Sequence, residues 1–190
     1  VDDDAINAFA LPGGFIGMNA GLILASETES EVAGVLAHEV AHVTQRHIAR
    51  SLYDNQRSSI ISMASMLAAV LLGMASDSRS NDAMSGVLAA GQAATMQRQI
   101  NFTRSNELEA DRIGIGTLSS AGFDPSGMAT FFEKLSRRFG SRSAPAFLLT
   151  HPTSPERIAD ARVRIRQLPP TVNVENSISY ETASARLEVL

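Results

Sequence analysis

Two histidines four residues apart, with a glutamate directly after the first, are the residues of this sequence best spaced to do chemistry together. They are His38, Glu39 and His42. On a helix this spacing turns the chain by about 400°, so both imidazoles lie on one face, where one metal ion can bind both. Glu39 lies about 100° farther around, near enough to act as a general base without binding the metal. The segment predicts a catalytic zinc site.

A catalytic zinc ion takes three protein ligands and leaves one position open. The chain has no cysteine, so imidazole and carboxylate are the available ligands. Glu107 and Asp111 are four residues apart on a second predicted helix, whereas Glu109 points to another side. We expect Glu107 to be the third ligand, and Asp111 to orient a ligand histidine through its other ring nitrogen.

The two remaining histidines are His47 and His151. An extended HExxHxxGxxH site is excluded because Gln45 and Ile48 stand where it needs glycine and histidine. His47 would face away from the metal, so we interpret it as a surface or structural histidine. We expect His151, held between a proline turn and a capped helix, to point at the metal site. There it would donate a hydrogen bond to the oxyanion, or occupy the open zinc position and keep the enzyme latent.

Helices must position these side chains, and helical periodicity dominates the chain beyond its first residues. A first long helix is expected over residues 29–54, starting from a capping box of Thr28 and Glu31. Its predicted apolar face consists of Val32, Leu36, Val40 and Val43.

A second long helix is expected over residues 83–121, broken near Asn101 and ended by Gly122 as its C-cap glycine. Shorter helices are expected over residues 124–139 and 154–168, each begun by a polar cap followed by proline. A polar loop is expected over residues 77–82, and a polar linker over residues 171–179 precedes the start of a last helix near Tyr180.

Two short apolar runs on either side of Pro-Gly-Gly predict a β-hairpin over residues 7–19. The fold class is therefore α+β, mainly α, with a small N-terminal sheet. An extended substrate could add to a free edge of this sheet as another strand. The candidate edge consists of Asn7, Ala8, Phe9 and Ala10; the neighbouring run over residues 15–19 is the alternative.

The segment from Ile60 to Ala75 is almost wholly apolar, but its 16 residues fall short of the roughly 20 that span a bilayer. We interpret it as a core or capping helix; peripheral membrane contact and a hydrophobic gate are the alternatives. The net charge of −4 leaves no basic face of the kind that nucleic acid needs, so that class is excluded. A chain of 190 residues suits one well-buried domain.

Four motifs in this order resemble the zinc metallopeptidases related to HtpX and the CAAX prenyl endopeptidases, most of all their soluble periplasmic, BepA-like branch. The motifs are residues 7–14, residues 38–42, residues 107–111, and His151-Pro152 through Arg157-Ile158. The resemblance covers residues 5–168. It implies a zincin-like fold of the gluzincin kind, with one zinc ion per chain.

The resemblance also implies a function: a zinc-dependent endopeptidase that hydrolyses internal peptide bonds of unfolded or misassembled proteins, in outer-membrane protein quality control. The location would be the periplasm of a Gram-negative bacterium. Residues 1–168 would form the peptidase domain, and residues 169–190 a linker and the start of a truncated tetratricopeptide-repeat region that contacts the outer-membrane assembly machinery. The alternative is a latent or non-proteolytic chaperone or scaffold in the same assembly process.

Overall fold

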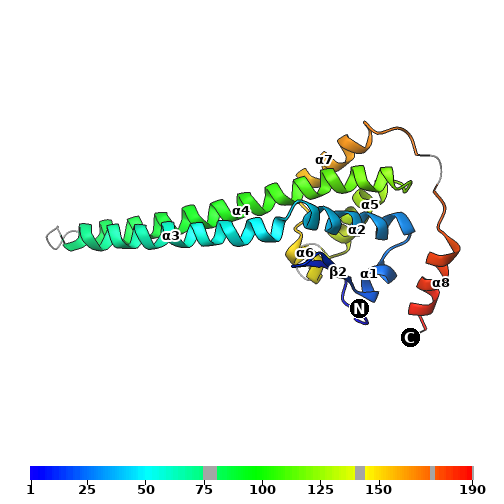
Figure 1. The fold of residues 1–190 in the computed structure, drawn as a ribbon, viewed down its shortest axis with the longest axis horizontal. Helices are drawn as coiled ribbons and strands as arrows, with labels where there is room; N and C mark the ends of the chain where they lie inside the picture. The colour runs from blue at the N-terminus through cyan, green and yellow to red at the C-terminus, as the bar shows by residue number, and fades with distance from the viewer. Residues whose placement is uncertain (75–80, 140–143, 172–173, 190) are drawn as a thin grey trace. The chain divides into compact units, whose positions relative to one another are not determined.

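The structure is a computed structural model that describes residues 1–74, 81–139, 144–171 and 174–189. In these ranges a two-stranded sheet is followed by helices (Figure 1). The chain divides into two compact units, one containing residues 1–46 and 107–190 and the other residues 47–106. All the predicted site residues belong to the first unit.

The sheet is the predicted hairpin, formed by β1 (Ala8–Leu11) and β2 (Phe15–Met18). The strands are antiparallel, with the first residue of β1 opposite the last residue of β2. Gly13 and Gly14 have φ angles of 95° and 87°, in the left-handed region that favours glycine. The prediction is confirmed, with each strand one residue shorter than expected.

The first long helix is shorter than predicted. After α1 (Ala20–Ala25), α2 covers Glu29–Thr44, and α3 begins anew at His47. Arg46 lies between them with a φ angle of 55°, a left-handed conformation that a continuous helix cannot contain. The single helix expected over residues 29–54 is therefore wrong, although its predicted start is correct.

The start of α2 is capped as the sequence indicates, because the Thr28 hydroxyl oxygen accepts a hydrogen bond from the Glu31 amide at 3.2 Å. The Glu31 carboxylate, however, accepts from the amide of Glu27 and not of Thr28. The N-terminal half of the expected capping box is thus confirmed, and the reciprocal half is shifted by one residue.

The apolar face predicted for α2 is not its buried face. Leu36 is 43% exposed, whereas Gly34, Val35 and His38 are buried. The buried face packs against α5 (Ser126–Phe139). A Cβ atom on Gly34 would lie 2.9 Å from backbone atoms of α5, so glycine permits the two helices to approach closely. This contact fixes the position of α2, and therefore of its two histidines, relative to α5.

The second long helix, α4, covers Asn81–Ser120 without the break expected near Asn101. Gly122 ends it with a φ angle of 86°, and the Phe123 amide donates to the Leu118 carbonyl at 3.2 Å, which confirms the C-cap. The α4 helix carries Glu107 into the first unit.

Three shorter helices complete the first unit: α6 (Ala146–Thr150), α7 (Pro155–Ile165) and α8 (Ile178–Leu187). The Ser154 hydroxyl oxygen caps α7 by accepting from the Arg157 amide at 3.2 Å, as predicted. The α7 helix ends three residues earlier than expected, and α8 begins two residues earlier.

The core of the first unit is built around the rings of Phe131, Phe132 and Phe147, all fully buried. Phe132 lies with its ring centroid 5.8 Å from that of His38, and Phe147 lies 5.0 Å from that of His151. Aromatic packing therefore fixes the orientation of two site histidines from the side of the core.

In the second unit, α3 (His47–Met74) and the first part of α4 run side by side (Figure 1). Ile60 and Met63 are 68% and 64% exposed, so on the described side chains the expected core or capping helix is wrong. Ala75 and most of the predicted 77–82 loop lie outside the described residues. Among the helices that the structure describes, none is long and apolar enough to cross a membrane.

Candidate metal centre

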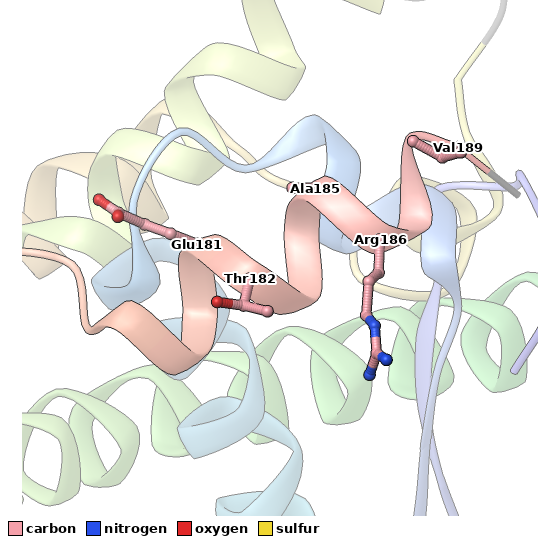
Figure 2. A pocket seen from close by; sticks show the side chains of 5 residues that line it. All are labelled: Glu181, Thr182, Ala185, Arg186 and Val189. Carbon is pink, nitrogen blue, oxygen red and sulfur yellow. The ribbon is translucent and has the colours of Figure 1, made fainter.

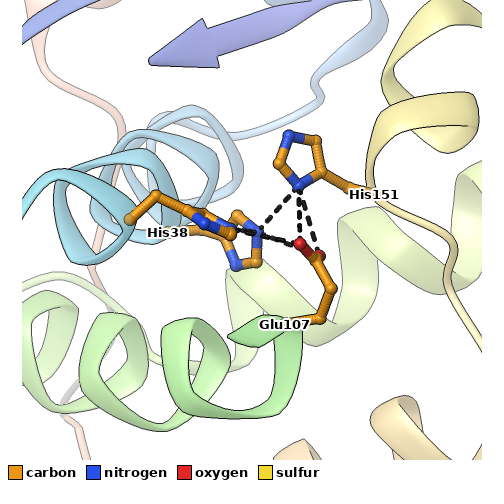
Figure 3. A group of neighbouring side chains, drawn as sticks. His38, Glu107 and His151 are labelled. Atoms are coloured by element: carbon orange, nitrogen blue, oxygen red, sulfur yellow. Dashed lines mark hydrogen bonds and ion pairs between the residues drawn. The ribbon is translucent and has the colours of Figure 1, made fainter. Parts of the chain in front are cut away.

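The structure brings together four buried side chains that three separate segments supply. His38 and His42 come from α2, Glu107 from α4, and His151 from the turn after α6. One donor atom from each of these residues lies within 4.8 Å of all the others. Figure 3 shows the His38 and His151 rings and the Glu107 carboxylate directed toward a common point.

The spacing of these donor atoms is nearly uniform. His38 Nε2 lies 3.0 Å from His42 Nε2, 3.3 Å from His151 Nδ1 and 3.4 Å from Glu107 Oε2. Glu107 Oε1 lies 3.3 Å from His42 Nε2, and both carboxylate oxygens lie 3.2 Å from His151 Nδ1. Ligands at about 2.0–2.1 Å around a tetrahedral zinc ion are about 3.3 Å apart. The donor set therefore fits a single tetrahedral ion.

Asp111 supports the first ligand from behind. Its Oδ1 lies 2.9 Å from His38 Nδ1, the ring nitrogen that faces away from the other donors. Although burial alone lowers the pKa of His38, the carboxylates of Asp111 and Glu107 raise it to about 9. A carboxylate in this position fixes the ring so that Nε2 faces the donor cluster.

The two carboxylates of α4 stay ionised in spite of their burial. Burial alone raises the pKa of Glu107, but the imidazoles of His151, His38 and His42 lower it well below its usual range. For Asp111 the same burial effect is outweighed by Arg157 and His38, which lower its pKa. Burial mainly lowers the pKa of His42, which keeps the ring in the neutral form that binds metals.

Arg157, on α7, joins three parts of the site. Its Nε and Nη2 each donate to Asp111 at 2.8 Å, and its Nη1 lies 2.8 Å from Glu107 Oε2. The same Nη1 donates to the Pro152 carbonyl at 2.8 Å, in the turn that carries His151. The guanidinium is almost fully buried, so these contacts are shielded from solvent.

The formal charges of the buried site leave a deficit of positive charge. Glu39, Glu107 and Asp111 contribute three negative charges and Arg157 contributes one positive charge, while the three histidines are neutral in their metal-binding form. The net formal charge is −2, which a divalent cation would balance. Buried charges in proteins are usually paired or bound to metals, so the charge count agrees with the geometry.

Comparisons with known proteins agree with this geometry. The sequence profile described as "Peptidase family M48" matches residues 1–165. A beta-barrel assembly-enhancing protease of Escherichia coli K12 is 46% identical over 98% of this chain and 37% of its own length. A putative protein of the same name from Vibrio cholerae is 44% identical over 98% and 38%. The chain belongs to peptidase family M48.

Family M48 is found well beyond these bacteria, since a mitochondrial metalloendopeptidase OMA1 of Arabidopsis thaliana is 33% identical over 83% of this chain. The chain accordingly has a zincin-like fold. It spans less than two fifths of the length of the two bacterial relatives.

Arg157 belongs to the last of the four sequence motifs, but its role in this M48 site is not among the predictions made from sequence. A signal was present: an arginine near the start of a helix whose other side chains bury an apolar face, five residues after the proline that follows His151. Its partners, Asp111 and Glu107, are 46 and 50 positions away along the chain, so spacing could not identify them.

Three further residues of the sequence predictions have buried side-chain atoms. His47 is buried at the start of α3 and is not among the four clustered donors, as expected of a structural histidine. The side-chain oxygen of Asn7, beside β1, is buried without a hydrogen bond from any described residue. Glu39 is buried on α2, with its Oε1 3.3 Å from His151 Nε2.

A hollow along α8 is separate from the metal centre. Figure 2 shows the five side chains that line it: Glu181, Thr182, Ala185, Arg186 and Val189. None of them belongs to the donor set or its supporting residues. The side chains that line the hollow are therefore not part of the metal centre.

Proposed function

We propose that this M48 domain is a zinc-dependent endopeptidase in which His38, His42 and Glu107 hold the metal ion. The observation that carries the proposal is the set of donor-to-donor distances of 3.0–3.4 Å in a buried cluster with a formal charge of −2. Zinc in this position would polarise a scissile carbonyl and make a water molecule more acidic. Asp111 would orient His38, and Arg157 would orient Glu107.

Glu39 is proposed as the general base. It is buried beside the ligands on α2, and its Oε1 lies 3.3 Å from His151 Nε2. The carboxylate would take a proton from the attacking water and pass it to the nitrogen of the leaving amine as the peptide C–N bond breaks. Its position one residue after His38 directs it toward the same side of α2 without making it a ligand.

His151 is proposed to hold the fourth position while no substrate is bound. Its Nδ1 lies 3.3 Å from His38 Nε2 and 3.2 Å from both Glu107 oxygens, the spacing of a ligand, and its Nε2 lies 3.3 Å from Glu39 Oε1. Substrate would have to displace this ring. Once displaced, the imidazole could donate a hydrogen bond to the carbonyl oxygen as charge develops there, so both roles expected from the sequence can belong to one reaction cycle.

An extended polypeptide is the proposed substrate, added to the edge of β1 at Asn7, Ala8, Phe9 and Ala10. The β1 strand lies against α2, and the Phe147 amide of α6 donates to the Ile6 carbonyl just before β1 begins. The buried, unpaired oxygen of Asn7 could accept a hydrogen bond from such a chain. Backbone pairing would favour unfolded chains over particular sequences.

The biological setting is proposed from the relatives. Two of them are named as enhancing the assembly of β-barrels, and they come from Gram-negative bacteria. We propose that this domain removes unfolded or misassembled outer-membrane proteins in the periplasm. Contact with the assembly machinery would involve parts of those relatives that this chain does not match. We also propose that the peptidase domain ends near residue 168 and that a separate region follows it.

The test combines zinc content with casein cleavage for the wild type and three variants: Glu39→Gln, Glu107→Ala and His151→Ala. We expect about one zinc per chain in the wild type. Glu39→Gln should keep zinc and lose about 10²- to 10⁴-fold in cleavage rate, because only proton transfer is removed. Glu107→Ala should weaken zinc binding 10-fold or more by rough estimate. A wild-type protein that binds no zinc would overturn the proposal.

A second function is favoured by the position of His151. A domain whose fourth ligand position is held by its own histidine could act as a latent or non-proteolytic chaperone or scaffold. The variant His151→Ala separates the two: if it cleaves casein faster than the wild type, the domain is a peptidase held latent. If zinc binds and neither protein cleaves any substrate, the scaffold function is favoured.

A further inference from the structure

The described side chains of the second unit are distributed in the opposite way to those of a water-soluble helical hairpin. Two paired helices in water bury large apolar residues along the seam between them. Among the described side chains of α3 the half-buried ones are Ile48, Ser51, Asp54 and Ser65, and the last three have separations of 3 and 11 that match a coiled-coil seam. Three of these four described side chains are polar, although apolar side chains are expected at such positions in water.

The same holds on α4, where the half-buried positions of its first half are Leu88, Gly91 and Thr95. Leu88 is the single large apolar side chain among the half-buried residues described in the 58–97 range. Small and polar residues at a helix–helix contact, with large apolar residues outside, are typical of hairpins surrounded by lipid.

The large apolar side chains of α3 point outward and form a stripe. Its members are exposed and lie within an arc of about 80° on one side of the helix. They are Ile60, Met63, Leu67 and Val70. On α4, Met96 and Ile100 are also exposed and share a face. Nothing in the described part of the hairpin covers this stripe, so water alone is an unfavourable surrounding for it.

Charged residues of the second unit fall outside two long stretches of its sequence. Residues 58–76 and 83–97 contain no charged side chain, and the residues between these stretches include Asp77, Arg79 and Asp82. The flanking residues 47–57 and 98–106 contain four arginines and one aspartate, although the whole chain has a net charge of −4. The arginines are Arg50, Arg57, Arg98 and Arg104. Arg50 lies over the ring of Phe102, so the basic residues of the two helices are at the same level of the hairpin.

We propose that the uncharged half of this hairpin, residues 58–74 of α3 with the part of α4 beside it, embeds its stripe in the surface of an anionic lipid bilayer. The arginine zone would then lie at the level of the phosphate groups, with which its charge is complementary. Tyr53, 70% exposed, lies in the arginine zone, where aromatic residues mark the membrane interface.

The length of the uncharged half agrees with partial embedding. Seventeen residues of α3 extend about 25 Å, less than the hydrocarbon thickness of about 30 Å. A helix that lies in the interface needs one apolar side and basic flanks, both of which this hairpin has. A protein partner could also cover the stripe. Binding to a protein would not explain why the arginine zone beside the stripe has four positive charges and one negative charge, whereas binding to anionic lipid would.

The test uses the full chain, whose lack of cysteine allows a single labelling site. An environment-sensitive fluorophore is attached at Leu67→Cys, or at Ile178→Cys on α8 as the control. Each protein is mixed with vesicles of phosphatidylglycerol or of phosphatidylcholine. We expect a blue shift of the emission at position 67 with phosphatidylglycerol vesicles and none at position 178.

Two double variants then separate the two contributions. Met63→Gln with Val70→Gln should weaken vesicle binding roughly tenfold or more, because two apolar side chains leave the lipid. Arg57→Gln with Arg98→Gln should weaken binding to phosphatidylglycerol about 30-fold and leave phosphatidylcholine binding unchanged. A matched control pair, Val163→Gln with Ile178→Gln, removes two exposed apolar side chains of the first unit and should change neither.

Three results would overturn the proposal. The first is an absence of any emission shift at position 67 with either kind of vesicle. The second is vesicle binding by the Met63→Gln, Val70→Gln protein that equals the wild type. The third is a shift at position 67 that unfolded casein produces and vesicles do not, which would make the stripe a polypeptide-binding surface. None of these readouts depends on peptidase activity or on zinc.

Discussion

Replacing Arg157 by glutamine should destabilise the metal-free protein far more than an ordinary surface substitution. The guanidinium is almost fully buried and makes two contacts of 2.8 Å with Asp111 and one of 2.8 Å with Glu107. Removing one partner of a buried ion pair costs about 3–5 kcal/mol, because the remaining charge stays buried without compensation. Two carboxylates would lose this partner and keep only His38, whose pKa of about 9 lets it carry one positive charge, so we expect a loss within that range.

Arg162 offers a matched control on the same helix. Its Nε and Nη2 also donate to one carboxylate, that of Glu133, but the Arg162 side chain is 52% exposed. An exposed pair contributes less than about 1 kcal/mol. Arg162→Gln and Arg157→Gln therefore remove the same group from the same kind of pair and differ mainly in burial.

The assay is thermal unfolding of the metal-free proteins, with and without added zinc. In a protein of this size each kcal/mol lowers the melting temperature by about 2–4 °C, so Arg157→Gln should melt about 10 °C or more below the wild type. Zinc should recover part of the loss, because a divalent ion also compensates Glu107. Equal effects of the two substitutions, or a loss below about 1 kcal/mol for Arg157→Gln, would refute the reasoning from burial.

Further predictions concern the helix that carries the histidines, the metal and a surface pair. Gly34→Ala should lower the free energy of unfolding by about 1–3 kcal/mol and weaken zinc binding, because a Cβ there meets the α5 backbone; calorimetry and zinc titration measure both. Thr28→Ala should cost about 1 kcal/mol in denaturant unfolding through loss of the α2 cap, with zinc affinity unchanged. Removing zinc by chelation should lower stability by about 4 kcal/mol at a free zinc concentration 1,000 times the Kd, and unchanged melting on chelation would contradict this. Arg162 lowers the pKa of Glu133, so this pair stabilises the fold above pH 4.5 and loses that effect as the pH falls through the lowered pKa; the small difference in stability between Arg162→Gln and wild type at pH 7 should shrink as the pH is lowered below 4.5.

The clustering of the site residues could be predicted from sequence because its main pattern is local. His38, Glu39 and His42 lie within five residues on one helix, so helical geometry alone places the two imidazoles together. Glu107 could be predicted because its own helix also carries Asp111 one turn away. In both cases the decisive spacing lies within a single helix. The structure places His38, His42 and Glu107 around one point together with His151, and Asp111 lies beside His38. Glu39 is outside this donor set, and its role as a base stays a prediction.

Arg157 and the end of α2 could not be predicted in this way. The role of Arg157 depends on contacts with residues some 50 positions away, which only the tertiary fold brings near. The end of α2 depends on Arg46 adopting a left-handed conformation that arginine has no intrinsic reason to prefer. The surrounding fold imposes that conformation, and helical periodicity on both sides of it gives no sign of the break.

Burial was predicted wrongly twice, on α2 and on α3, and the two errors have one cause. On α2 the large apolar residue Leu36 faces outward, along a hollow of about 460 Å³, because the inward face is occupied by the polar residues of the metal centre. On α3 the apolar stripe at Ile60 is exposed while Ser65 is half-buried. Periodicity identifies the apolar face of a helix but not the surroundings of that face. A helix that buries its polar side departs from the folding rule for water, and such departures are expected at functional sites. On α2 the departure leads to the metal; on α3 the corresponding expectation is a lipid surface, which the fluorophore at position 67 can detect.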